Sequence, residues 1–339
     1  MSRPGLVIGG YTSDTEGSGP GLTVARSHAD GRLETVGETT VSGPSFVVAH
    51  PRLPLLYAVL ERAADGGLAV FADDAPAPRL LAEHPSGGSL PCHLALDPEG
   101  RWLAIANYGD GTVTAYRLGE DGMPEPGPLM FPHEGRGPRP DRQEGPHAHQ
   151  AVFGPGGVLY VTDLGTDQMR RFLPGMRPHP DGPVRLAPGS GPRHFLHHEG
   201  HWYVTGELDG SVRVYDDEWR EAGAVRASGV SGESGVSGES GGENLPSHIA
   251  LSADGRHLYV ANRGPDTLSV FEVDGPRLTM TAEVPSGGSW PRHFAIDGDH
   301  LYVANQRSDS VAVLALRDGL PEPTGQALTV GTPSCVLIR

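Results

Sequence analysis

The stretch LPCHLALDPEGRWLAIANYGDGTVTAYRL, residues 90–118, decides the fold because it recurs along the chain. Two close copies are LPSHIALSADGRHLYVANRGPDTLSVFEV at 245–273 and WPRHFAIDGDHLYVANQRSDSVAVLAL at 290–316. Each copy has a proline near its start and short apolar runs separated by Gly, Asp and Asn. Apolar runs bounded by turn-forming residues are typical of consecutive antiparallel strands. The repeated unit is therefore predicted to be a small β-sheet.

Looser copies of this unit begin at Gly43, Gly145 and Gly191. A proline leads each unit, and a period of roughly 40–50 residues matches the four-stranded blades of a propeller. We therefore predict an all-β fold, a seven-bladed β-propeller with four-stranded blades. The successive leading prolines are 47, 55, 46, 54, 45 and 42 residues apart, at Pro44, Pro91, Pro146, Pro192, Pro246, Pro291 and Pro333.

The two ends of the chain are expected to share one blade. The last copy, TPSCVLIR at 332–339, stops after one strand, and the first residues supply three more: LVIGGYT, GLTVARS and RLETVGET. Pairing the C-terminal strand with the N-terminal strands removes the exposed edge of an open ring. We expect one domain over residues 1–339, with the Ser/Gly-rich segment 227–243 as a flexible surface loop.

Composition narrows the class of partner. The formal charge of −16 argues against a nucleic-acid partner, which needs a basic face. No apolar stretch is long enough for a transmembrane helix, and no secretory signal pattern is present, so we expect a cytoplasmic protein with two reduced cysteines. Aromatic residues make up only 6% of the chain, so no obligate protein partner is predicted.

Comparing the copies with one another separates residues that serve the blade from residues that serve a site. At the start of the inner strand, one position reads Phe46, His93, His149, His194, His248, His293 and Cys335, and we expect most of these histidines to make blade-to-blade contacts. Among them, His149 is also a candidate to face a ligand. The position before it reads Ser45, Cys92, Ala148, Arg193, Ser247, Arg292 and Ser334. The two arginines there must meet a carboxylate or a bound anion, because an unpaired charge near the axis is costly.

Two positions at the end of the second strand lie at the same end of the blade, since successive strands are antiparallel. The first reads Gly10, Leu60, Asn107, Asp163, Gly206, Asn262 and Asn305, which favours a role in the turn. The next reads Tyr11, Glu61, Tyr108, Leu164, Glu207, Arg263 and Gln306. These residues share no chemical type, which indicates selection by a ligand.

The third blade has an unusual lead-in, HEGRGPRPDRQEGPHAHQ at 133–150. One interpretation is a solvated, charged loop. The alternative is a lid that brings Arg142, Gln143 and His147 over the mouth of the channel.

Six motifs in order resemble the bacterial lactonase family of seven-bladed propellers, which includes 6-phosphogluconolactonases and fungal carboxymuconate-lactonising cyclases. The resemblance covers nearly the whole chain. It implies a site that uses Arg193, Glu207, Arg263 and a histidine of the PHAH run, residues 146–149. The motifs are DRQEGPHAH (141–149), DLGTDQ (163–168), GSGPRH (189–194), GEL (206–208), ANRG (261–264) and PRHF (291–294).

These observations predict a metal-independent, cofactor-free lactonase that hydrolyses a small anionic lactone, similar to 6-phosphogluconolactone, at one mouth of the channel. In this hypothesis arginine stabilises the developing oxyanion, and Glu207 or His147 activates water. The predicted catalytic residues are Glu207, Arg193, His147 and Arg263, and the predicted substrate-binding residues are Arg142, Gln143, His149, His194, Arg292 and Glu61.

Three alternatives remain open at this stage. The same residues suit a lactonising cyclase acting on an unsaturated or polar acid. A calcium-dependent lactonase would use oxygen ligands from Glu61, Asn107, Asp163, Glu207 and Asn262, although the nearby arginines would repel the cation. The third alternative is a propeller that only binds a partner.

Overall fold

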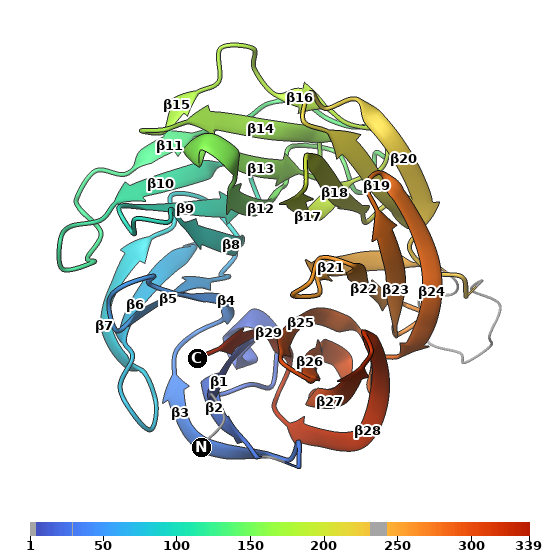
Figure 1. The fold of residues 1–339 in the computed structure, drawn as a ribbon. Helices are drawn as coiled ribbons and strands as arrows, with labels where there is room; N and C mark the ends of the chain where they lie inside the picture. Colours follow the sequence, from blue (N-terminus) through green and yellow to red (C-terminus); the bar gives the residue numbers. More distant parts are fainter. Residues whose placement is uncertain (1–4, 29, 231–242) are drawn as a thin grey trace.

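The structure, a computed structural model, describes residues 5–28, 30–230 and 243–339 and arranges them as a ring of seven β-sheets (Figure 1). The predicted seven-bladed propeller is confirmed. Most of the predicted loop 227–243 falls on residues 231–242, which lie outside the described residues. Across the described ranges no helix combines the length and apolarity that a bilayer span requires.

Each blade runs from the centre of the ring outwards, and blades are numbered here by their inner strands from β4 onwards. The inner strands are β4 (Pro44–Ala49), β8 (Pro91–Leu96), β12 (Ala148–Phe153), β17 (Pro192–His198), β21 (Leu245–Leu251), β25 (Pro291–Asp297) and β29 (Pro333–Ile338). The second strands are β5 (Leu55–Leu60), β9 (Trp102–Asn107), β13 (Leu159–Asp163), β18 (His201–Gly206), β22 (His257–Arg263), β26 (His300–Asn305) and β1 (Gly5–Gly10).

The outer half of each blade is more variable. The third strands are β6 (Gly67–Ala72), β10 (Val113–Arg117), β14 (Gln168–Leu173), β19 (Ser211–Asp216), β23 (Thr267–Asp274), β27 (Ser310–Arg317) and β2 (Gly21–Ser27). The fourth strands are β7 (Arg79–Pro85), β11 (Leu129–Phe131), β20 (Glu221–Arg226), β24 (Arg277–Pro285), β28 (Leu320–Thr329) and β3 (Leu33–Thr40). In blade 3 two short strands, β15 (Arg177–Pro178) and β16 (Val184–Arg185), take the place of the fourth.

The ring closes where the sequence predicts. The C-terminal strand β29 pairs antiparallel with β1, with Ile8 opposite Val336 and Leu6 opposite Ile338. The strand order of this blade is β29-β1-β2-β3, so one blade is built from both ends of the chain.

Blades are joined by apolar packing and by a repeated tyrosine contact. The second strands are almost wholly buried, as expected for β-branched and aromatic residues covered on both faces. Tyr57 donates a hydrogen bond to the Gly122 carbonyl (2.6 Å), and Tyr203 donates one to the Gly275 carbonyl (2.7 Å). Each carbonyl lies in the outer hairpin of the following blade, so the phenol satisfies its polar end while its ring fills the space between blades.

The register of blade 3 corrects one of the sequence-based positions. In β12, Ala148 pairs with Asp163, as Pro192 pairs with Gly206 in β17. The backbone N–H of Gln150 donates to the Thr162 hydroxyl, as the backbone N–H of His194 does to the Thr205 hydroxyl. His149 therefore occupies the position of Arg193, and Gln150 occupies the histidine position. The prediction that His149 is equivalent to the other inner-strand histidines was wrong by one residue, because Ala148 takes the place of the leading proline and Pro146 therefore lies two residues before it, one more than the sequence comparison allowed.

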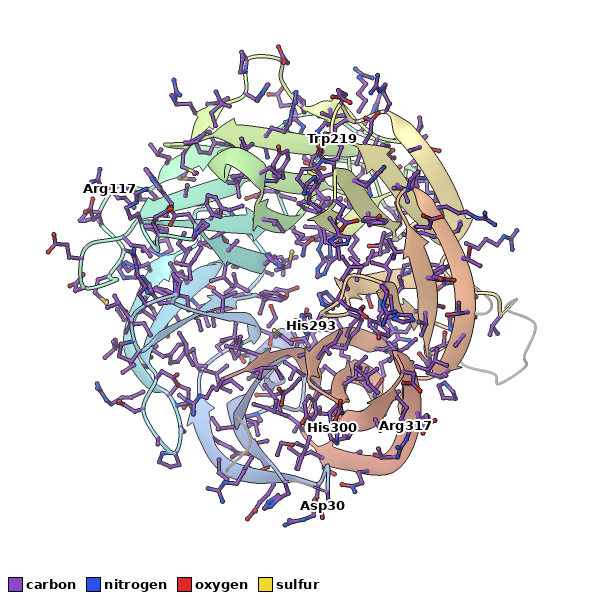
Figure 2. All side chains as sticks on the ribbon, viewed as in Figure 1. Asp30, Arg117, Trp219, His293, His300 and Arg317 are labelled. Carbon is purple, nitrogen blue, oxygen red and sulfur yellow. The ribbon has the colours of Figure 1, made fainter. Side chains whose placement is uncertain are left out.

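The remaining histidines form a closed belt of rings around the axis. Ring centroids are 4.0 Å apart for Phe46 and His93, 5.5 Å for His93 and His194, and 5.2 Å for His194 and His248. The belt continues from His248 to His293 (4.0 Å) and back to Phe46 (5.5 Å). Figure 2 places His293 beside the centre of the ring. The predicted blade-to-blade role of these four histidines is confirmed.

The belt histidines are held in the neutral form. Burial lowers the pKa of His93 and of His293 to about 3, and it holds the pKa values of His194 and His248 well below their ordinary value. Two of the imidazoles also accept backbone N–H groups: His93 Nδ1 from Ala151 and His293 Nδ1 from Val336. A protonated ring would lose that acceptor, so the contacts favour the neutral form.

The belt makes the fold sensitive to acid. Each belt histidine is neutral in the folded chain but binds a proton in the unfolded chain below a pH of about 6.5. For His93 and His293 the stability that the neutral form contributes is therefore present above about pH 6.5 and is lost as the pH falls towards 3, by up to about 1.4 kcal/mol per pH unit for each group. Replacing His93 by Gln, the residue that blade 3 carries at this position, should reduce the slope of unfolding free energy against pH by about one proton between pH 4 and 6. Urea denaturation at several pH values measures this slope, and an unchanged slope would contradict neutral burial of His93.

Candidate active site

Four of the predicted site residues meet at one end of the channel. Glu207 directly follows β18, and Arg263 is the last residue of β22. Arg193 is the second residue of β17, where the pairing with β18 is interrupted between Pro192 and Phe195. Arg142 comes from the lead-in loop before β12. The start of an inner strand lies beside the end of the second strand, so the antiparallel blade brings these side chains together.

The Glu207 carboxylate is surrounded by three guanidinium groups. Arg142 Nη2 donates to its Oε1 (2.6 Å), and Arg263 Nη2 donates to its Oε2 (2.6 Å). Arg193 Nε lies 2.9 Å from Oε2, close enough for an ion pair but not directed as a hydrogen bond. The carboxylate is only 5% exposed. We call Glu207 and these three arginines the Glu207 cluster.

Backbone carbonyls fix two of the arginines. Arg193 Nη1 donates to the Ser247 carbonyl (2.6 Å), and Arg263 Nε donates to the Leu245 carbonyl (3.1 Å). Both acceptors lie in β21, so blade 5 orients both side chains. The guanidinium groups are thus held in place before any ligand arrives, which is the condition for strong electrostatic stabilisation.

Burial and the neighbouring charges shift the pKa values of Glu207 and Arg193. Burial raises the pKa of Glu207, but Arg263 and Arg193 outweigh it and hold that pKa well below its usual range. Burial, together with Arg263, lowers the pKa of Arg193 to about 9. Both groups therefore stay charged at neutral pH. Both oxygens of the Glu207 carboxylate are occupied by arginine side chains, so the geometry assigns Glu207 to orienting the arginines.

The two histidines of the PHAH run have different surroundings. His149 is buried near Arg193 and Glu207, and burial and Arg193 hold its pKa well below the ordinary value. Its Nδ1 is buried and has no hydrogen-bond partner among the described residues. His147 instead stacks on Tyr108 (4.5 Å between centroids), and its Nδ1 donates to the Tyr108 carbonyl (2.8 Å). Its Nε2 lies 3.3 Å from Glu144 Oε1, so both ring nitrogens of His147 have partners other than Glu207.

Tyr108 lies beside these residues, although it was not among the predicted catalytic or substrate-binding residues. Burial, followed by the charge of Glu207, raises its pKa, so its hydroxyl stays protonated beside Arg142. It contacts His147 and also His149 (5.7 Å between centroids). Its place among the diverse residues after the second strands was the available signal.

Two predicted substrate-binding residues do not join the cluster. The Gln143 side chain is fully buried, where Nε2 donates to the Leu164 carbonyl (2.8 Å) and Oε1 accepts from the Arg139 N–H (3.1 Å). It holds the shape of the lead-in loop, which in turn delivers Arg142. His194 belongs to the belt, where its Nδ1 lies 2.9 Å from Nδ1 of His248.

The remaining two predicted residues, Arg292 and Glu61, form a second group at the same mouth. Arg292 Nη2 lies 3.8 Å from Glu61 Oε1. Arg292 is within electrostatic reach of Arg193, Arg263 and Glu207. The four arginines and two glutamates of the mouth carry a formal charge of +2, although the whole chain carries −16.

Three of the side chains weighed for calcium make hydrogen bonds within their own blades. Asn107 Nδ2 donates to the Thr112 carbonyl, and Asn262 Nδ2 donates to the Ser269 hydroxyl, so both asparagines stabilise their blades. Asp163 Oδ1 accepts the backbone N–H groups of His147 and Thr166. The predicted turn role of this position is confirmed for these residues. Within the described part of the chain, no three His, Cys, Asp or Glu side chains are grouped to hold a metal ion.

Removing the central carboxylate should destabilise the fold. In Glu207→Gln three buried or half-buried arginines lose their shared counter-charge, and breaking such a buried pair costs about 3–5 kcal/mol. Urea denaturation at pH 7.5 measures this cost. The matched control is Glu322→Gln, which removes an exposed ion pair with Arg317 and should change stability by less than about 0.5 kcal/mol. Equal stability of Glu207→Gln and the parent would show that the arginines do not depend on this carboxylate.

Comparison with known proteins agrees with this architecture. The model of the family described as "Lactonase, 7-bladed beta-propeller" matches residues 5–338. The 6-phosphogluconolactonase of Bacillus subtilis (strain 168) is 32% identical over 267 residues, which are 75% of this chain and 74% of the relative. The 6-phosphogluconolactonase of Formosa agariphila is 28% identical over 311 residues, 86% of each chain.

A solved structure extends the likeness to three dimensions. The periplasmic gluconolactonase of Pseudomonas aeruginosa superposes with a TM-score of 0.88 at 28% identity, covering 99% of both chains. Because the family model spans nearly the whole sequence and the fold agrees, this chain belongs to the lactonase family of seven-bladed β-propellers.

Proposed function

We propose that this protein is a metal-independent lactonase that hydrolyses a small anionic lactone of the 6-phosphogluconolactone type at the mouth formed around Glu207. The observation that carries the proposal is the positive charge of that mouth. Four arginines face two carboxylates there, so the mouth has a formal charge of +2 in an acidic chain. A buried excess of positive charge is costly until an anion enters.

The relatives support hydrolysis as the direction of the reaction. Two of them are named 6-phosphogluconolactonase, and a solved structure at 28% identity is described as a gluconolactonase. Sugar lactones with or without a phosphate are therefore the substrates to test first. The same positive charge would repel a divalent cation, which favours chemistry carried by side chains.

The arginines are suited to stabilise the transition state. When water adds to the lactone carbonyl, its oxygen becomes an oxyanion. Fixed donors aimed at that oxygen contribute about 10²–10³-fold each in rate. Arg193 and Arg263 are the best-oriented donors, because Glu207 on one side and carbonyls of blade 5 on the other hold both guanidinium groups. Arg142 is 35% exposed and is placed to meet the charged group of the substrate as it enters.

His149 is the best candidate for the base. It is neutral, buried beside Arg193 and carries an Nδ1 atom that no described residue occupies. In the proposed step His149 accepts a proton from water as the new C–O bond forms. The tetrahedral intermediate then breaks its bond to the ring oxygen, and His149 returns the proton to that oxygen. The product is the open-chain hydroxy acid, and atoms and charge balance.

The proposal is tested by hydrolysis assays. We expect the parent to hydrolyse 6-phosphogluconolactone or glucono-1,5-lactone in the presence of EDTA. Arg193→Lys should lower kcat/KM by at least about 100-fold, because lysine cannot reproduce the fixed guanidinium geometry. Glu322→Gln is the control and should retain the activity of the parent. Failure of the parent to open any of several sugar lactones would overturn the hydrolase proposal.

A second test separates the two histidines of the PHAH run. His149→Gln should lower kcat by about 10²–10⁴-fold, the usual contribution of a general base, whereas His147→Gln should lower it less than about tenfold. The pKa of His149 lies well below its ordinary value. As the pH is lowered, kcat/KM for glucono-1,5-lactone should therefore decrease with a midpoint below about pH 6.5. A larger loss of kcat in His147→Gln than in His149→Gln would assign the proton transfer to His147 instead.

A further inference from the structure

A second polar cluster at the mouth lies outside the Glu207 cluster. It consists of Arg292 from the start of β25, Gln306 after β26, Glu61 after β5 and Tyr11 after β1. Blades 6, 1 and 7 supply these residues, whereas the Glu207 cluster comes from blades 4 and 5 and the loop before blade 3. We call this group the Glu61 cluster.

The contacts within the Glu61 cluster leave much of its hydrogen-bonding capacity unused. The Tyr11 hydroxyl donates to Glu61 Oε2 (2.8 Å), which fixes one carboxylate oxygen. The other oxygen, Oε1, has Arg292 Nη2 as its ion-pair partner at the long distance of 3.8 Å. Arg292 Nη1 lies 3.5 Å from Gln306 Oε1, at the outer limit for a hydrogen bond. A guanidinium group has five N–H donors, and most of those on Arg292 have no hydrogen-bond partner among the described residues.

The cluster is protected enough to discriminate between ligands. The Arg292 side chain is 19% exposed and that of Glu61 is 12% exposed. The Tyr11 ring packs under the Arg292 guanidinium, 5.2 Å from its centroid, and this contact holds the arginine towards the mouth. Polar groups in such a position lose much of their contact with water, so a ligand that pairs with them gains more than it would at the surface.

The charge of the cluster indicates what it binds. Arg292 and Glu61 cancel, so the Glu61 cluster is neutral, and its carboxylate would repel a phosphate or carboxylate group. The excess positive charge of the mouth lies in the Glu207 cluster instead. A neutral set that offers both a carboxylate acceptor and guanidinium donors fits groups that donate and accept at once, which is the property of hydroxyl groups.

We propose that the Glu61 cluster is a hydroxyl-binding subsite that recognises neighbouring hydroxyl groups of a polyhydroxylated ligand, with Glu61 accepting from one and Arg292 donating to the next. The inference deepens the proposed lactonase function and rests on it for the identity of the ligand as a sugar lactone or its hydroxy acid. The Glu207 cluster takes the carbonyl and the anionic group, and the Glu61 cluster selects substrates with hydroxyl groups on the ring. Sites built to bind a hydroxyl discriminate strongly against analogues that lack it.

The test compares two ligands that differ in their hydroxyl groups. D-gluconate and 6-hydroxyhexanoate both have a six-carbon chain with a carboxylate and a terminal hydroxyl, but only gluconate has the intervening hydroxyls. Titration calorimetry on the full chain should show tighter binding of gluconate. Glu61→Gln should reduce that preference by about 10–100-fold, as expected for the loss of a hydrogen bond to a charged group. Tyr11→Phe keeps the ring under Arg292 and should reduce the preference by about 3–10-fold.

The control and the contrary outcomes are distinct. Glu322→Gln should keep the preference of the parent, and circular dichroism establishes that each variant folds. If Glu61→Gln fails to fold, Tyr11→Phe carries the test alone. Equal affinity of the parent for both ligands, or an unchanged preference in the folded variants, would overturn the hydroxyl subsite. The outcome is independent of turnover, so a parent that opens no lactone contradicts the proposed function without deciding this subsite.

Discussion

Closure of the ring by β29 and β1 is the constraint on which the rest of the structure depends. Each blade packs mainly on its two neighbours, so an open ring would expose the apolar faces of two blades and an unpaired strand edge. Pairing of Ile8 with Val336 removes both exposures. The same closure brings Tyr11, from the N-terminal end of the chain, beside Glu61 and Arg292. The mouth is therefore complete only when the two ends of the chain have met.

Two neighbouring groups of ionisable side chains, the Glu207 cluster and the histidine belt, are held in different charge states. In the Glu207 cluster one carboxylate orients three arginines that would otherwise repel one another, and the excess charge remains for a ligand. Next to the Glu207 cluster, the imidazoles of the belt stay neutral, because burying additional positive charges there would be too costly. The two arrangements depend on each other, since protonated belt histidines would add positive charge directly beneath the arginines.

The sequence predicted the fold and the four principal charged residues because repetition makes departures visible. Proline spacing revealed seven blades, and Arg193 stood out because small residues fill most equivalent positions. The register of blade 3 escaped prediction, since the two-residue offset of Pro146 from the start of β12 cannot be seen without the pairing of Ala148 with Asp163. Gln143 was misjudged for a related reason. Its neighbours in the sequence are charged, but only the folded loop shows that both ends of its amide are occupied by backbone groups.

The position after each second strand has a consequence for how such a protein changes over evolutionary time. The residue before it, such as Asn107 or Asn262, carries hydrogen bonds of the blade, whereas Glu61, Glu207 and Arg263 at the position itself pair with side chains from other blades at the mouth. The hydrogen bonds of the blade and the charges of the mouth are thus carried by adjacent residues. A change at Glu207 must therefore be matched by changes in the arginines that it holds, whereas Gln306, whose contact with Arg292 is long at 3.5 Å, can change with little effect on other blades. A ring of this design can acquire a new specificity most readily in the blades whose residue at this position shares no buried charge.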